Sequence, residues 1–436
     1  MAVVVDNAKL VLNAFAAIFQ NNLASASAVT WKQYDGEMED RNRLTVVEQV
    51  GPRFAITQTT NGVQDLTSGV QDVVFGSEQF QLNQVFGTSM GWGDFTKIRD
   101  LNEARESTAI KNAALNLAEK IDAYVLRTAA LASNNWTGTP GNNISTYDNV
   151  ASGYTRLKEE GVDDADLRGI FTYADMQALG SVITSNNASL ADAGVGVYRE
   201  GFDGKVAGIP TLFTQQLPTL TVGTRPASGA NVKMNAAAQN VNYSAVSISA
   251  APGQYMSQTI NITVSAAGTE TVKDGEVFTI AGVNAWDNRL GASQGRLQQF
   301  RVIGDYTAVA GAITAMRIFP AIIVPGSGSG GDINVNTANA TVDSVPGAAA
   351  LITFLGAASA QVKPRLIIQK EAIIVNTADL IMPATGMALR KSLTKIPLSV
   401  RMWRDSTFST GDHRVRFDVA LTANVRDRRR VVRING

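Results

Sequence analysis

The chain has 436 residues, with 38 basic and 38 acidic side chains, no cysteine and a single histidine, His413. Without cysteine, disulfide scaffolds, thiol catalysis and cysteine-ligated zinc are excluded, and a Ser-His-Asp triad would have to be built on His413. The length predicts about two to three domains of ordinary size. The composition favours a protein that works by shape and packing, and we expect no catalytic, metal or cofactor site.

The N-terminal residues carry no pattern of a secretory leader, because Met1 to Val5 lead directly into Asp6 without a basic segment or a cleavage site. The most apolar stretch, residues 347–360, has 14 residues. A membrane-spanning helix needs about 20, so a buried helix is the better interpretation. We therefore expect a protein that is made and folded in a cytoplasm and does not contact a membrane.

The N-terminal part of the chain changes from a helical to an extended pattern. Apolar residues at helical spacing predict a helix over 6–23. Alternating runs between Leu44 and Phe86, separated by turn signals such as Asn61-Gly62, predict a long β-hairpin. This hairpin has too few apolar residues to bury both faces, so it needs another surface to lie against.

The strongest helical pattern follows, over 96–134. At about 1.5 Å per residue such a helix would span roughly 57 Å, which predicts an elongated subunit built along a spine. Two shorter helices with a kink are the alternative. Beyond it, helices over 148–161 and 174–183 and strands over 167–173 and 205–217 favour an α+β body.

The composition changes at about Thr221. From there to Pro325, short β-type runs alternate with turns, which is typical of a small β-barrel or sandwich. A Gly/Ser-rich segment follows, and it is typical of a linker. We therefore predict an inserted β-domain over 221–331 that folds when it is expressed alone. The remaining expected elements are a largely helical segment and three β-rich runs, over 338–360, 366–375, 396–402 and 414–425.

Two features could carry chemistry. An acidic cluster could supply a carboxylate pair or a cation site, but it lacks EF-hand spacing, and a solvated loop is the simpler interpretation. This cluster comprises Glu159, Glu160, Asp163, Asp164 and Asp166. A carboxylate-based hydrolase that uses Asp163, Asp164 or Asp166 is the alternative from another class of protein. His413 follows Gly411-Asp412 in an expected turn, and we interpret it as structural.

The zero net charge hides an asymmetry. Residues 35–110 hold twelve acids and six bases, whereas residues 390–436 hold twelve bases and four acids. The interpretations are complementary surfaces that meet between copies or between arms of one subunit, a basic terminus that faces a polyanion, or a solvated strand edge guarded by arginine. The candidate assembly contacts are Glu48, Arg53, Asp65, Asp72, Arg428, Arg429 and Arg430. Changing the last three together to alanine is expected to impair assembly or genome retention without unfolding the subunit.

Several short segments, in this order along the chain, carry a family resemblance. They are Val47-Glu48-Gln49, Asp65-Leu66-Thr67, Asp100 to Arg105, Gly208 to Pro218, Lys273-Asp274-Gly275-Glu276, Ala281-Gly282-Val283 and Asn334-Val335-Asn336-Thr337. Together with the predicted elements, they make the chain resemble the major capsid proteins of tailed bacteriophages with the Hong Kong 97 fold. Within that group it is most similar to the short-tailed Salmonella-phage coat proteins, which carry an insertion domain.

The resemblance implies a fold with named parts. It is an α+β capsid fold with an N-terminal arm, an extended hairpin loop, a long spine helix, peripheral and axial domains, and an inserted all-β barrel. The implied ranges are 1–43 for the arm, 44–95 for the hairpin loop and the start of the peripheral domain, 96–134 for the spine helix, 135–220 for the peripheral and axial body, 221–331 for the insert, and 332–436 for the axial return and the C-terminal peripheral strands.

The resemblance also implies a function. The expected protein is not an enzyme; many copies of it assemble with a scaffolding protein into an icosahedral shell that encloses double-stranded DNA. The other implied partners are a portal protein and, as a further candidate, a decoration protein. The implied location is the virion capsid, after assembly in the cytoplasm of a bacterial host. An encapsulin-type compartment, which shares the fold but normally lacks the insert, is the alternative.

The resemblance allows one chemical test on the sequence. The covalent crosslink of the fold's prototype needs a lysine on the extended loop, and residues 44–86 contain none. We therefore expect non-covalent contacts to hold the shell.

Overall fold

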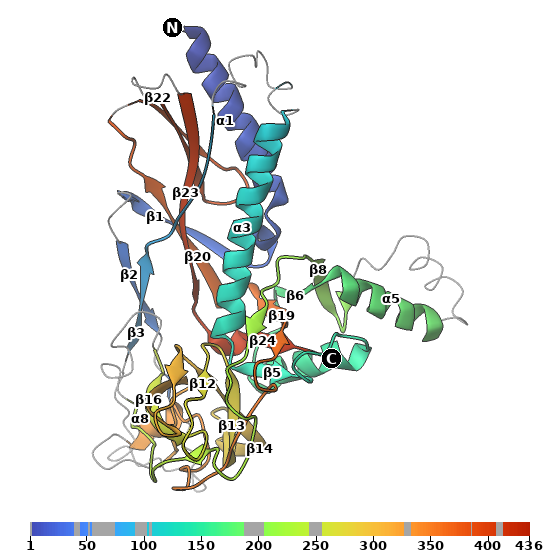
Figure 1. Cartoon of the computed structure of the whole chain (residues 1–436), viewed down its shortest axis with the longest axis vertical. Coiled ribbons are helices and arrows are strands. Elements are labelled where there is room, and N and C mark those ends of the chain that lie inside the picture. The colour runs from blue at the N-terminus through green and yellow to red at the C-terminus, as the bar shows by residue number, and fades with distance from the viewer. Residues whose placement is uncertain are drawn as a thin grey trace, which may run out of the picture.

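The computed structural model describes residues 2–38, 44–50, 53–54, 75–91, 103, 107–186, 205–243, 255–326, 333–384, 386–406 and 413–436. These residues form an elongated α+β subunit (Figure 1). A sheet flanked by two long helices occupies one end, a second sheet lies beside its base, and a β-domain forms the other end. The elongated α+β fold expected from the sequence is confirmed.

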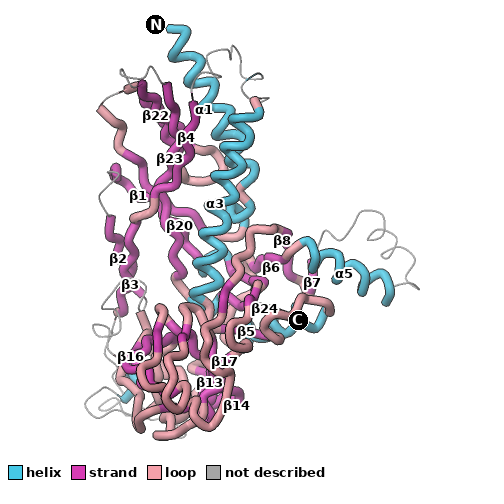
Figure 2. The backbone as a smooth tube through the Cα atoms, in the orientation of Figure 1, coloured by secondary structure: helices cyan, strands magenta, loops and turns pink. Residues whose placement is uncertain are grey.

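Helices α1 (Ala2–Asn22) and α3 (Thr108–Ala132) run side by side along the first sheet (Figure 2). Small side chains such as Ala14 and Ala114, both fully buried, let the helices pack closely. Phe15 of α1 stacks on Phe417 of the sheet, with ring centroids 4.1 Å apart. The helix expected over 6–23 is therefore confirmed, and burial of its apolar face against α3 and the sheet stabilises it.

The spine helix differs from its expected range. Ser107 has an extended backbone (φ −57°, ψ 116°) and is the N-cap of α3, so the helix begins at Thr108. Its 25 residues span about 37 Å at 1.5 Å per residue. The expectation of one unbroken helix over 96–134 is wrong at Ser107, because the ψ of 116° at this residue lies outside the helical region, although the Ser107 side chain makes no capping hydrogen bond. Residues 92–102 and 104–106 lie outside the described part of the chain.

The first sheet joins the two ends of the chain. Its order is β1-β20-β23-β22-β21, and β4 also pairs with β23. β1 runs parallel to β20, with Thr30 opposite Ile374, and the other pairs are antiparallel. The bounds are β1 (Thr30–Met38), β4 (Val85–Gly91), β20 (Ile373–Leu380), β21 (Met387–Ser392), β22 (Ser399–Ser406) and β23 (His413–Val425).

The expected hairpin is present at its base. β2 (Leu44–Val50) pairs antiparallel with β3 (Gly76–Leu82) over the full length of both strands. The predicted turn at Asn61-Gly62 lies outside the described residues, as do 51–52 and 55–74. The described strands therefore confirm where the hairpin begins and returns.

The second sheet has the order β5-β24-β19-β6-β8-β7. Its strands are β5 (Asn135–Thr137), β6 (Leu167–Phe171), β7 (Lys205–Val206), β8 (Ile209–Phe213), β19 (Arg365–Gln369) and β24 (Val431–Ile434). α4 (Tyr147–Glu159) begins at a capping box of Thr146 and Asn149, and α5 (Tyr173–Asn186) follows β6. The helices expected over 148–161 and 174–183 are confirmed.

The inserted β-domain is a sheet that nearly closes on itself. Its order is β10-β11-β16-β14-β13-β17, and the two edges meet because the Met234 N–H donates to Ala350 O and the Ile352 N–H to Val232 O, both at 2.9 Å. The strands are β10 (Lys233–Met234), β11 (Gln258–Thr263), β13 (Val277–Asp287), β14 (Ala292–Val302), β16 (Ala312–Phe319) and β17 (Ile352–Phe354).

Two small sheets and several short helices complete the described chain. β9 (Leu220–Thr221) pairs with β18 (Gln361–Val362), and β12 (Thr271–Val272) pairs with β15 (Tyr306–Thr307). The short helices are η1 (Ala24–Ser27), α8 (Ile333–Ala338), η3 (Lys370–Ala372) and η4 (Arg428–Arg430). No helix in this part of the chain is long and apolar enough to span a membrane.

The helical segment expected over 338–360 is wrong. α8 ends at Ala338, and Ile352 and Phe354 of β17 enter the core of the β-domain. The alanine-rich composition favours a helix, but Pro346 and Gly356 interrupt it, and the open edge of β13 supplies hydrogen-bond partners. The β-domain sheet therefore includes chain beyond residue 331.

Candidate assembly site

The C-terminal turn η4 lies where the hairpin, the β-domain and the second sheet meet. Asp427 is its N-cap, and the Asp427 side chain accepts a hydrogen bond from the Arg429 N–H. Three consecutive arginines, Arg428, Arg429 and Arg430, form this turn. Arg428 binds Glu78, whereas Arg429 and Arg430 both bind Asp427.

Arg428 is an internal residue. Its Nη2 donates to Glu78 Oε1 in β3 at 2.6 Å, and its Nη1 donates to Tyr255 O at 3.4 Å. Its guanidinium also lies 4.9 Å from the centre of the Phe319 ring. Arg428 therefore connects the hairpin base to the β-domain.

Arg429 and Arg430 share one carboxylate. The Asp427 carboxylate accepts two hydrogen bonds from the guanidinium of Arg429 and one from the guanidinium of Arg430, each at 3.1 Å. Burial alone would raise the pKa of Asp427, but Arg429, Arg430 and Arg53 hold it well below its usual range. Arg430 also donates to Gln369 Oε1 at 2.9 Å, which joins the turn to β19.

Two more arginines are buried near this turn. Arg433 is fully buried, and its Nη1 donates to Gly275 O at 2.7 Å while its Nη2 donates to Ser133 O. Burial, reinforced by the charge of Arg301, lowers the pKa of Arg433 to about 9. Burial, reinforced by the charge of Arg428, lowers the pKa of Arg301 to about 10. Arg433 thus ties the end of the spine helix to the β-domain.

Helix α4 contacts the β-domain through its C-terminal carboxylates. Arg296 of β14 lies 2.9 Å from Glu159 and donates to Glu160 at 2.8 Å. Burial raises the pKa of Glu160, and the nearby Arg156 and Arg429 offset this only in part. The side chain of Gln299 adds a neutral contact, since it accepts from Trp136 N at 2.8 Å and donates to Trp136 O at 2.9 Å.

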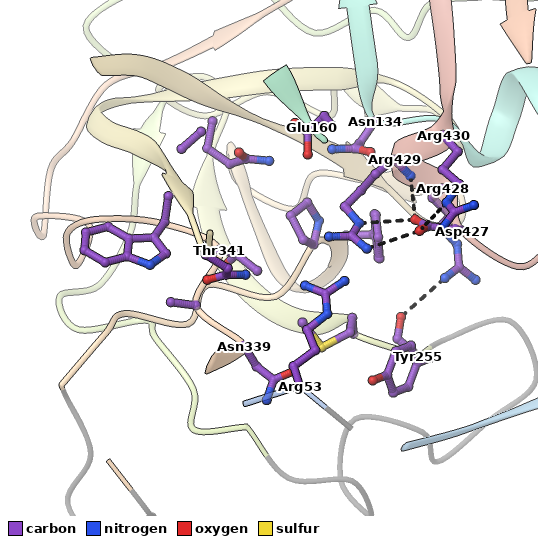
Figure 3. Close-up of a pocket in the computed structure, with 18 of the residues that line it drawn as sticks. Arg53, Asn134, Glu160, Tyr255, Asn339, Thr341, Asp427, Arg428, Arg429 and Arg430 are labelled. Atoms are coloured by element: carbon purple, nitrogen blue, oxygen red, sulfur yellow. Dashed lines mark hydrogen bonds and ion pairs between the residues drawn. The ribbon is translucent and has the colours of Figure 1, made fainter. Parts of the chain in front are cut away.

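A cavity of about 410 Å³ lies beside the turn, and Arg53, Glu160, Tyr255 and Arg429 are among its lining residues (Figure 3). Burial, together with the Tyr243 hydroxyl at 3.0 Å, raises the pKa of Tyr255. No group of three or more metal-ligating side chains occurs among the residues that the structure describes. The arrangement can bind charged groups and hold parts of the subunit together.

The structure brings together only some of the candidate assembly contacts. Arg53 is exposed at the cavity, close enough for the Arg429 charge to act on it, and Glu48 lies in β2 opposite Glu78. Asp65 and Asp72 lie outside the described residues, and so does the side chain of Glu48.

The acidic cluster 159–166 is not one site. Glu159 and Glu160 bind Arg296, whereas Asp164 binds Lys158 and accepts a hydrogen bond from Tyr154. The solvated-loop interpretation is therefore wrong for Glu160, whose side chain is 13% exposed. His413, expected in a turn, is the first residue of β23.

Sequence reasoning missed the partners that bury these charges. Glu78 lies in the short strand β3, Tyr255 in a loop and Arg301 near the end of β14, and none of them belongs to a sequence motif. The unequal charge of the two ends of the chain is the one signal that points to Glu78, and it points to neither Tyr255 nor Arg301.

The helical arm, the hairpin, the spine helix, the two sheets and the inserted β-domain are the parts expected of a capsid subunit with the Hong Kong 97 fold. The family model described as "P22 coat protein - gene protein 5" matches residues 7–430, so the chain belongs to the P22 coat protein family. It is a structural major capsid protein, not an enzyme; many copies assemble into an icosahedral shell, and its location is the virion capsid.

The solved structures to which the chain is similar are distant from it in sequence. The chain is similar to one from Mycobacterium phage Che8, with 8% identity, coverage of 90% of this chain and 84% of that one, and a TM-score of 0.41. It is similar to the capsid of Cyanophage P-SCSP1u, with 10% identity, coverage of 93% and 86%, and a TM-score of 0.40. The CUS-3 coat protein I-domain is 26% identical, and the match covers 29% of this chain and 97% of that one with a TM-score of 0.21. No curated protein sequence matches this chain.

Proposed function

We propose that this capsid protein assembles on a scaffolding protein in the cytoplasm of a bacterial host and that non-covalent contacts hold the shell. The shell encloses double-stranded DNA, which the basic C-terminal part contacts without sequence specificity. A portal protein is a further partner, and a decoration protein is a candidate. The family and the exposed surface of the hairpin support this proposal.

The observation that carries the proposal is the apolar surface of the hairpin. Val47 of β2 is 55% exposed, and Phe54 and Phe75, which flank the hairpin strands, are each 54% exposed. Exposed apolar side chains that gather on one element mark an interaction surface. A second copy of the subunit is the occupant that fits, because shell assembly is homo-oligomeric.

Charge complementarity supplies the second part of the contact. We propose that Glu48, Asp65 and Asp72 of the hairpin face basic residues of a neighbouring copy, with Arg53, Arg429 and Arg430 at the edge of the same surface. Charged pairs of this kind direct the docking of subunits more than they add affinity. Arg428 acts inside its own subunit, through Glu78.

The experiment is co-expression of the chain with the scaffolding protein of the same phage, followed by electron microscopy. Closed shells of uniform size are expected. Monomers and small oligomers under all such conditions would overturn the proposal. Shells that hold a cargo enzyme instead of DNA would identify an encapsulin-type compartment.

A further inference from the structure

The lining of the cavity beside η4 is rich in charged side chains. Among the described residues, six arginines and three carboxylates belong to this lining. Glu78 and Glu159 pair with two of these arginines, Arg428 and Arg296, from outside the lining. Within the lining, guanidinium groups therefore outnumber carboxylates.

Two guanidinium groups meet across the cavity. The side chains of Arg53 and Arg429 reach toward each other (Figure 3), and the charge of Arg429 lowers the pKa of Arg53 to about 10. Asp427 is already bound by Arg429 and Arg430. Among the described residues Arg53 forms no ion pair of its own, so the repulsion between the two cations is not fully compensated.

Residues of the lining also carry buried donors. The Trp286 indole Nε1 and the Arg296 Nη1 belong to lining residues, are buried, and have no acceptor among the residues that the structure describes. Arg301 and Arg433, 7% and 0% exposed, carry further positive charge nearby. Buried N–H donors and cations without a compensating anion are unfavourable, so this region favours a negatively charged ligand.

We infer that the cavity binds an oxyanion, a phosphate or a carboxylate group, held between Arg53 and Arg429. The planar guanidinium of Arg53 matches the two oxygens of either group. Arg429 uses its Nε and Nη2 on Asp427, so its Nη1 is the donor that it offers to the ligand. Arg53 follows the hairpin strand β2, and Arg429 belongs to the C-terminal turn, so the bound anion fastens the hairpin to the body of the subunit. The residues that form the site belong to one subunit, and the inference does not depend on the scaffolding protein.

The test is calorimetric titration of the purified subunit with inorganic phosphate, at constant ionic strength set with chloride. We expect saturable binding to one site per subunit. Arg53→Gln is expected to weaken this binding about tenfold or more, since a charge-assisted hydrogen bond is lost. The matched control, Arg414→Gln at the exposed start of β23, should bind as the unmodified chain does. Circular dichroism verifies that both variants are folded.

The same titration is made with glutarate, a dicarboxylate. The inference would be overturned if neither phosphate nor glutarate bound saturably, or if Arg53→Gln and Arg414→Gln lost the same amount of binding affinity. Arg53→Lys provides a second check, because it keeps the charge but removes the fork, and its affinity should lie between those of the unmodified chain and Arg53→Gln.

Two further titrations identify the source of the oxyanion. Phosphate that binds both free subunits and assembled shells indicates a phosphate ligand. Glutarate binding to free subunits, with phosphate binding lost after assembly, indicates that a carboxylate of a neighbouring copy fills the site. Either result supports the oxyanion site.

Discussion

Arg428 Nη2 donates a hydrogen bond to Glu78 Oε1 over 2.6 Å, and the two residues are 350 positions apart in the sequence. Their side chains are 6% and 1% exposed. Since Arg428 also contacts Tyr255 and Phe319, one residue near the C-terminus holds the hairpin base against the inserted domain. This pair makes the hairpin part of the folded subunit before any neighbour is present.

Removal of the Arg428 side chain is therefore expected to destabilise the subunit. Arg428→Ala leaves Glu78 buried without its cation, and such a loss costs about 3–5 kcal/mol in the free energy of unfolding. Urea unfolding of the purified subunit measures this. Arg430→Ala is the control, since Arg430 is 38% exposed and its ion pairs contribute about 1 kcal/mol or less.

Equal destabilisation by Arg428→Ala and Arg430→Ala would contradict the internal role of Arg428. The result also bears on the triple change to alanine at 428–430. The sequence predicts that the subunit stays folded after this change, whereas the structure predicts that loss of Arg428 destabilises it.

The extent of the inserted domain can be tested with two fragments. A fragment of residues 221–362 is expected to unfold cooperatively, whereas residues 221–331 should lack stable structure. The reason is that Ile352 and Phe354 of β17 are 0% and 2% exposed in the domain core, and truncating one buried phenylalanine alone costs about 3–5 kcal/mol. Far-UV circular dichroism during a urea titration compares the two; equal stability would show that β17 is dispensable.

The hairpin surface is expected to act in assembly and not in folding. Phe54→Asp should keep the thermal midpoint of the subunit within about 2 °C, because an exposed substitution changes stability by less than about 0.5 kcal/mol. The yield of closed shells, counted by electron microscopy, should fall sharply. Val309→Asp, on a side chain 77% exposed in the β-domain, is the matched control. Normal shells from Phe54→Asp would refute the hairpin contact.

Acid is expected to weaken the turn at Asp427. Its pKa in the folded subunit is lower than the ordinary value of 3.8, despite burial, because Arg429, Arg430 and Arg53 favour the charged form. The carboxylate therefore stabilises the fold fully above the unfolded pKa, and this contribution declines as the pH falls below about 4 toward the folded pKa.

Urea unfolding at several values of pH between about 2.5 and 6 measures the acid effect. The Asp427→Asn variant should be less stable than the unmodified chain at about pH 6 and should show a shallower loss of stability in acid. Asp163→Asn, in an exposed loop, is the control and should follow the unmodified chain. Parallel curves for all three proteins would rule out a contribution from Asp427.

Elements that depend on residues close together in the chain could be predicted from the sequence. The start of α4 at Thr146 depends on a capping box with Asn149, three residues later. The apolar stripes of α1 and α3 recur at helical spacing, and that spacing predicts which face is buried. These features need only neighbours within one or two turns.

Elements that depend on contacts with residues far away in the sequence could not be predicted in this way. β17 is a strand because β13 offers it an open edge, and its own alanine-rich surroundings favour a helix. Glu160 is buried because Arg296, 136 positions later, reaches it from the β-domain. The arginines at 428–430 look like a solvated run, and nothing near them in the chain indicates that the first is internal.

The sequence by itself determined the limits of the chemistry and the family. The sequence contains no cysteine, which excludes thiol chemistry and cysteine-bound metals, and it contains equal numbers of acidic and basic residues. Its helical and β-type segments follow the order that is typical of a capsid subunit. Only the tertiary structure decided which charges pair inside the subunit and which remain for other partners. The physical reason is that an ion pair depends on distance in space and on desolvation, and both are set by packing between segments hundreds of residues apart.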